Sequence, residues 1–144
     1  MKVIELKTLI RDAFRGVKLG GGLSLGQLKA VDSHRQGYSD RDFANLKFKD
    51  VTDDWEKLTV AILETCDCYA HLDPEGFRYY IPALCLAILD HYDSGSMRVI
   101  GTIGVLYPTK EFWESHMTMY SLLSKVQRES LAIFVKELPN FVEL

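Results

Sequence analysis

The chain has 144 residues, a formal net charge of −3, 47% hydrophobic residues and 26% charged residues. This balance is typical of a globular domain and excludes an intrinsically disordered chain. The negative charge and the lack of a basic run argue against nucleic-acid binding, because that binding needs clustered Lys and Arg to neutralise phosphates. A chain of this length forms one hydrophobic core, so we expect a single domain over residues 1–144.

The cysteine count and the apolar runs indicate the compartment. Three cysteines, an odd number, give no complete disulfide framework and favour a reducing environment. Charges interrupt the apolar residues at the N-terminus, unlike those of a secretory signal. The longest apolar run, 81–89, is far shorter than the roughly 20 residues that span a bilayer. We therefore expect a cytoplasmic protein that does not cross a membrane.

The first predicted helix is N-terminal, where Leu6, Leu9, Ile10 and Ala13 recur at intervals of three and four residues. Gly16 is expected to end it.

Three consecutive glycines at 20–22 then form a link, which no Gly-Lys-Ser/Thr follows as in a phosphate-binding loop. Ser24 and Gln27 have the spacing of a capping box and predict a second helix. Ser39 is expected to cap a short third helix that ends near Lys47.

A further substantial helix is predicted after Thr52 or Asp53, either of which can cap it. Its apolar stripe would run through Trp55, Leu58 and Ile62.

The central helix has the strongest start signal in the chain. Asp73 is a good cap, and Pro74 suits the first helical position, where a missing N–H costs nothing. Residues 77–89 are apolar on nearly all sides, which predicts a helix buried all round, over about 74–92. Pro82 is expected either to kink this helix or to divide it into two.

Residues 94–110 are expected to form a loop or a helical turn, because a lone strand would have no partner. Thr109 can cap a short aromatic helix. A second capping box, Ser124 with Gln127, predicts a last helix that Pro139 stops. The sequence therefore predicts an all-α domain, a bundle of about five to six helices around the buried central one.

The start of the central helix is also the main candidate site. Asp73, Glu75, Arg78 and Tyr79 could form a recognition surface beside the notch that Pro82 leaves in the backbone hydrogen bonding. A structural interpretation explains the same residues as a cap and a kinked core helix, in which Arg78 pairs with a local carboxylate. We favour this interpretation, since the cap and the kink have sufficient local causes.

Acidic residues cluster at Asp50, Asp53 and Asp54, and these are further candidate binding residues for a basic partner. Carboxylates near helix starts also offset the helix dipole, which is the simpler explanation.

Neither a metal site nor an active site is expected. The spacing of Cys66, Cys68 and His71 is not that of a zinc site, and Cys66 and Cys85 fall on apolar stretches. No nucleophile elbow, metalloprotease helix or Walker loop occurs. We therefore expect no cofactor, no metal and no enzyme activity.

The segment from Leu72 to Ala83 resembles an uncharacterised bacterial family of unknown function with the motif Leu-Asp-Pro-Glu-Gly-Phe-Arg-aromatic-Tyr-x-Pro-Ala. The resemblance extends to Ala13-Phe14-x-Gly16-Val17, to Trp55 and to Ser121-Leu122-Leu123 with Gln127-Arg128, and so covers most of the chain. It implies no established activity. By analogy, small acidic cytosolic bacterial proteins are often immunity partners of toxins.

Two functions from different classes follow. The first is a protein-binding module, most specifically an immunity protein that occludes a cognate toxin, with aromatic anchors among Tyr38, Tyr69, Tyr79 and Trp113. The alternative is a small enzyme or ligand-binding domain with its site at the Asp73–Arg78 helix start. A subunit that only forms homo-oligomers is a third possibility.

Overall fold

The computed structural model describes residues 1–91, 106 and 110–141. These residues contain helices and no strand, which confirms the all-α prediction. The α-helices are α1 (Val3–Ala13), α2 (Leu25–Asp32), α3 (Asp40–Asn45), α4 (Val60–Leu63), α5 (Pro74–His91), α7 (Trp113–Tyr120) and α8 (Lys125–Glu137). Single 3-10 turns are η1 (Leu46–Lys49), η2 (Trp55–Lys57), η3 (Tyr69–His71) and η5 (Leu138–Asn140).

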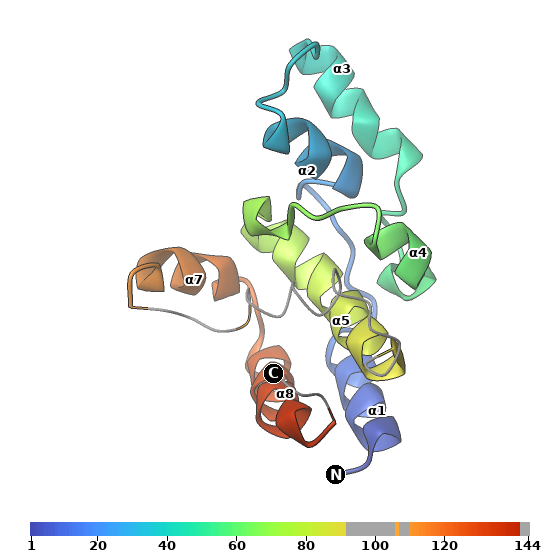
Figure 1. Cartoon of the computed structure of the whole chain (residues 1–144), viewed down its shortest axis with the longest axis vertical. Helices are drawn as coiled ribbons and strands as arrows, with labels where there is room; N and C mark the ends of the chain where they lie inside the picture. Colours follow the sequence, from blue (N-terminus) through green and yellow to red (C-terminus); the bar gives the residue numbers. More distant parts are fainter. Residues whose placement is uncertain (92–105, 107–109, 142–144) are drawn as a thin grey trace.

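Helix α5 is the centre of the fold, as the sequence predicts (Figure 1). Twelve of its 18 residues are buried, so it packs on almost every side. Helix α1 contacts both α5 and α8, and α7 contacts α5. Helices α2 and α3 lie together at one end of the molecule, away from α1 and α8 (Figure 1).

The predicted caps form as expected. Ser24 and Gln27 make a reciprocal capping box at the start of α2, and Ser124 and Gln127 make the same box at α8. The Ser39 hydroxyl accepts a hydrogen bond from the backbone of α3. Each cap depends on residues within three positions, which is why the sequence alone reveals it.

The helix predicted after Thr52 is wrong as a continuous element. The chain forms η2 and α4 instead, separated by Leu58, whose backbone is extended at ψ 106°. Asp54 caps η2 and Thr59 caps α4. The two caps lie five residues apart and each starts its own turn, so the apolar stripe through this segment is not one helix face.

Pro82 lies inside α5 without dividing it, because the helix runs unbroken from Pro74 to His91. Of the two alternatives for Pro82, division into two helices is therefore wrong. Tertiary packing compensates for the lost backbone hydrogen bond, since Pro82 and its neighbours are buried.

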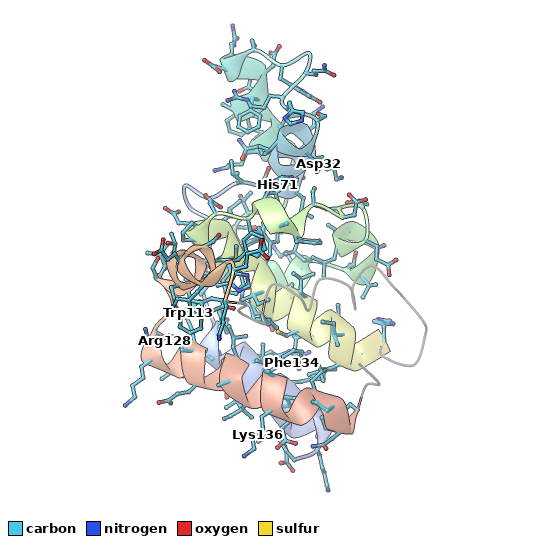
Figure 2. All side chains as sticks on the ribbon, turned by 60° about the vertical axis from the view of Figure 1, so that its left-hand side comes forward. Asp32, His71, Trp113, Arg128, Phe134 and Lys136 are labelled. Carbon is cyan, nitrogen blue, oxygen red and sulfur yellow. The ribbon has the colours of Figure 1, made fainter. Side chains whose placement is uncertain are left out.

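Helix α7 begins at Trp113, and its first turn has no side-chain cap. Thr109, the predicted cap, lies outside the described residues, as does the predicted loop at 94–110 apart from Leu106 and Lys110. Helix α8 is amphipathic: Phe134 faces the core and Lys136 faces outward (Figure 2). None of the described helices combines the length and the apolar character needed to cross a membrane.

Candidate functional site

The carboxylate of Asp73 joins two segments that are distant in sequence. Its Oδ1 accepts a hydrogen bond from Gly76 N at 3.0 Å, the helix cap, and a second from Leu23 N at 3.1 Å. Two backbone N–H donors are thus satisfied by one oxygen. Asp73 therefore fixes the start of α5 against the segment that leads into α2.

Glu75 also holds the start of α5 against the segment that leads into α2. Its Oε2 accepts a hydrogen bond from Gly21 N at 2.6 Å. The backbones come so close here that a Cβ on Gly22 would lie 2.7 Å from Gly76 N. The missing side chain of Gly22 thus allows its segment to approach the helix start closely. Both predicted carboxylates serve this junction, which supports the structural interpretation of the motif.

Tyr79 does not belong to a recognition surface, which corrects its place among the candidate site residues. The side chain is 0% exposed, and its hydroxyl donates to Val51 O at 3.1 Å. Tyr80, also buried, accepts a hydrogen bond from Leu25 N at 3.1 Å. Burial raises the pKa of both phenols above the ordinary value. The burial of Tyr79 agrees with the all-round apolar run predicted over residues 77–89.

Two of the three acids near residue 50 have local structural roles. Asp50 Oδ2 accepts a hydrogen bond from Gly26 N at 2.9 Å, and Asp54 Oδ1 accepts one from Glu56 N at 3.0 Å. Asp53 is exposed. Only Asp53 therefore remains without a local structural role.

Arg78 departs from the structural interpretation, because it pairs with no carboxylate among the described residues. Its Nε is buried and has no hydrogen-bond partner. The side chain lines a shallow pocket of about 470 Å³ together with Arg15 and Lys18. The sequence separates these residues by some 60 positions, so no local pattern reveals this pocket.

The cysteines are buried thiols. Cys66 Sγ and Cys68 Sγ lie 2.7 Å apart, and burial is the main cause that raises the pKa of Cys66 to about 12. Cys85 is fully buried and its pKa is raised for the same reason. His71 pairs with an acid and not with the thiols: its Nε2 lies 3.0 Å from Asp32 Oδ1, where η3 meets α2 (Figure 2). Within the described ranges no three His, Cys, Asp or Glu residues are grouped as metal ligands.

Helix α7 presents an apolar surface that the sequence does not reveal. Phe112 and Trp113 are 55% and 53% exposed, and Met117, one turn further on, is exposed too. We call these three residues the α7 face. A pocket of about 540 Å³ adjoins it, and its described lining is Lys110, Glu111, Phe112, Trp113, Glu114 and Ser115. Of the other aromatic anchors expected, Tyr38 is exposed and Tyr69 is buried.

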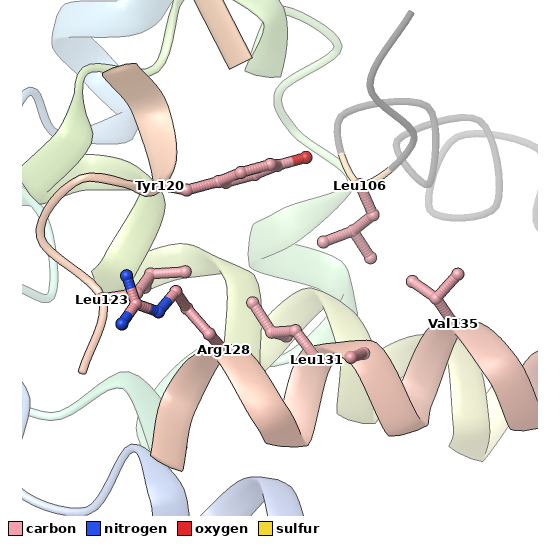
Figure 3. Close-up of a pocket in the computed structure, with 7 residues that line it drawn as sticks. Leu106, Tyr120, Leu123, Arg128, Leu131 and Val135 are labelled. Atoms are coloured by element: carbon pink, nitrogen blue, oxygen red, sulfur yellow. The ribbon is translucent and has the colours of Figure 1, made fainter. Parts of the chain in front are cut away.

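An apolar pocket of about 360 Å³ lies between the end of α7 and α8 (Figure 3). Its wall comes mainly from Leu123, Leu131 and Val135, with Leu106 opposite and Arg128 at one end. Burial raises the pKa of Tyr120, which also lines it. The described lining residues include no carboxylate, Ser or Cys.

The chain belongs to a family described as a family of unknown function (DUF6714), whose model matches residues 2–144. The match covers nearly the whole chain and agrees with the resemblance of the central motif to a family without known activity. No curated protein and no solved structure matches the chain.

Proposed function

We propose that this member of the family is a protein-binding module and that its partner docks on the α7 face. The supporting observation is the exposure of Phe112, Trp113 and Met117 on one short helix. Large aromatic and Met side chains are enriched in the cores of protein interfaces and carry most of their binding energy. Two more exposed apolar residues follow in sequence: Leu122, between α7 and α8, and Val126, in the first turn of α8.

The surroundings of the α7 face suit a basic partner. Glu111 and Glu114 line the same pocket as Phe112 and Trp113, and with Lys110 as the one cation the described lining has more acids than bases. A Lys or Arg side chain entering this pocket would contact carboxylates and an aromatic ring face at once, and both attract a cation. The chain's net charge of −3 would also favour the approach of a positively charged surface.

In its most specific form the proposal makes the chain an immunity protein in the cytoplasm, with a cognate toxin as its partner. The small size, the mild acidity and the absence of catalytic motifs support this form. An immunity protein needs only to cover the toxin's site, so it requires no reactive centre of its own.

Capture of partners from the native cell tests the binding proposal when two variants are compared. Trp113→Ala removes the main anchor, and Phe48→Ala removes an aromatic residue that is 86% exposed on η1, outside the α7 face. A partner that binds the wild type and Phe48→Ala but is lost from Trp113→Ala supports docking on α7. A partner retained equally by all three contradicts it.

Co-expression tests the immunity form separately. The captured partner alone should stop cell growth, and the wild-type chain should restore growth while Trp113→Ala should not. A partner that is harmless alone would exclude the immunity form without excluding protein binding.

Self-association is measured by sedimentation of the purified chain. A dimer lost in Trp113→Ala would assign the α7 face to a second copy instead.

One observation favours the alternative, a ligand-binding domain at the Asp73–Arg78 helix start. The carboxylates of Asp73 and Glu75 are occupied by backbone donors, but Arg78 lines an open pocket, and its buried Nε has no hydrogen-bond partner. The alternative therefore survives in a changed form, as a site for an anion rather than an acid–base pair.

A further inference from the structure

The pocket beside Arg78 lies where three elements meet: the turn after α1, the first turns of α5 and the start of α8. Its walls are formed by the side chains of Arg15, Lys18, Arg78 and Gln127 and by the backbone at Gly16 and Gly20. It shares no described lining residue with the pocket at the α7 face. Its volume of about 470 Å³ is within the range of small-molecule sites.

The charge of this pocket is opposite to that of the whole chain. Three of its lining side chains are cations, and none is an acid. Arg15 is paired with Asp12, but Lys18 and Arg78 form no ion pair within the described part of the chain. Glu75 is the nearby counter-charge, at the rim beside Gly20, where it is held by Gly21 N. The pocket therefore keeps a net positive charge.

One buried donor at this position is unsatisfied: the Nε of Arg78 has no hydrogen-bond partner. Gln127, which is only 8% exposed, also lines the pocket, and its Oε1 accepts a hydrogen bond from Ser124 N in the capping box. Buried donors without acceptors are unfavourable and rare, so an acceptor from outside the chain would stabilise the site.

The wall that carries Arg15 and Lys18 is held in place before any ligand binds. Trp55 Nε1 donates to Phe14 O at 2.8 Å, and Leu19 N donates to Thr52 O at 3.0 Å. Gly16 has φ +77°, a conformation that lets the chain turn directly after α1. A wall fixed at both ends loses little conformational freedom on binding.

We propose that this pocket binds a small molecule that carries phosphate. Every unsatisfied group described in it is a donor or a cation, which calls for an oxyanion. Two guanidinium groups match the oxygens of a phosphate by paired hydrogen bonds, and Lys18 adds a point charge. The volume exceeds that of one phosphate group, so the pocket has room for part of the molecule that bears it.

Titration of the full chain with inorganic pyrophosphate, followed calorimetrically at low salt, tests the proposal. We expect saturable one-to-one binding that Lys18→Gln weakens at least tenfold. Lys18 is exposed, so this change leaves the fold intact. The control is Lys49→Gln, which removes an equal charge from exposed η1 and should change the affinity less than twofold. No saturable binding, or equal weakening by both variants, would overturn the proposal.

Arg78 is tested by two substitutions, with circular dichroism to establish folding. Arg78→Gln should weaken pyrophosphate binding at least tenfold. Arg78→Lys, which keeps the charge and loses the planar fork, should give an intermediate affinity. Titration with citrate tests whether the pocket prefers carboxylates. Tighter binding of citrate than of pyrophosphate would contradict phosphate recognition. None of these changes touches the α7 face, so failure here leaves the protein-binding proposal in place.

Discussion

Gly22 lies so close to the backbone of Gly76 that it has no room for a side chain, and Gly76 has none because of the Asp73 carboxylate. A Cβ on Gly22 would lie 2.7 Å from Gly76 N, and a Cβ on Gly76 would lie 2.6 Å from Asp73 Oδ1. This contact places the segment before α2 directly on the first turn of α5. The carboxylates of Asp73 and Glu75 then hold the segment there.

Gly22→Ala should therefore lower the free energy of unfolding by about 2 kcal/mol, because the added methyl group forces backbone apart. Urea denaturation of the purified chain measures the change. Gly21→Ala is the matched control, since its Cβ would come no closer than 3.4 Å to any neighbour, the carboxylate of Glu75. Equal stability of Gly22→Ala and the wild type would refute the close approach.

Asp73→Ala should cost about 2 to 3 kcal/mol of unfolding free energy, because it removes both a helix cap and the hydrogen bond to Leu23 N. Thermal unfolding is a convenient measurement. Asp53→Ala serves as the control, because that carboxylate is exposed and should change stability by less than about 0.5 kcal/mol. A large effect of Asp53 together with a small effect of Asp73 would reverse the assignment of structural and surface acids.

Stability should fall at alkaline pH because of the buried tyrosines. Burial raises the pKa of Tyr80 in the folded chain, whereas in the unfolded chain the phenol loses its proton near pH 10. The stabilisation from Tyr80 is thus complete below about pH 10 and is lost as the pH rises toward the folded pKa, by at most about 1.4 kcal/mol per pH unit.

Comparing Tyr80→Phe with the wild type isolates this contribution, since lysine deprotonation affects both chains alike. The variant should be less stable at pH 8, where it lacks the acceptor for Leu25 N, yet lose less stability between pH 10 and 11. Urea unfolding at these pH values gives the comparison. Parallel pH curves for the two chains would mean that Tyr80 keeps its ordinary pKa.

Much of the fold could be predicted because its signals are local. The capping boxes at Ser24 and Ser124 and the start at Asp73–Pro74 are each contained within a few residues. The all-round apolar run likewise predicts the burial of α5. The prediction after Thr52 failed because two caps, Asp54 and Thr59, lie within one apolar stripe, and each starts its own turn.

The candidate site was less accessible to prediction. Tyr79 lies in the apolar run that predicts its burial, whereas the exposure of Trp113 on α7 depends on the neighbouring elements. The cationic pocket joins Lys18 to Arg78 across 60 residues, and their charges have no pattern along the chain. The composition does not suggest a cationic pocket, since the whole chain has a net negative charge.

The central claim is that the α7 face binds a partner through Trp113, and titration calorimetry of the captured partner tests it most directly. We expect Trp113→Ala to reduce the affinity by about 2 kcal/mol or more, roughly 30-fold, as a buried anchor does, while Phe48→Ala stays close to the wild type. Equal affinities for the wild type and both variants would contradict the claim, as would a loss confined to Phe48→Ala.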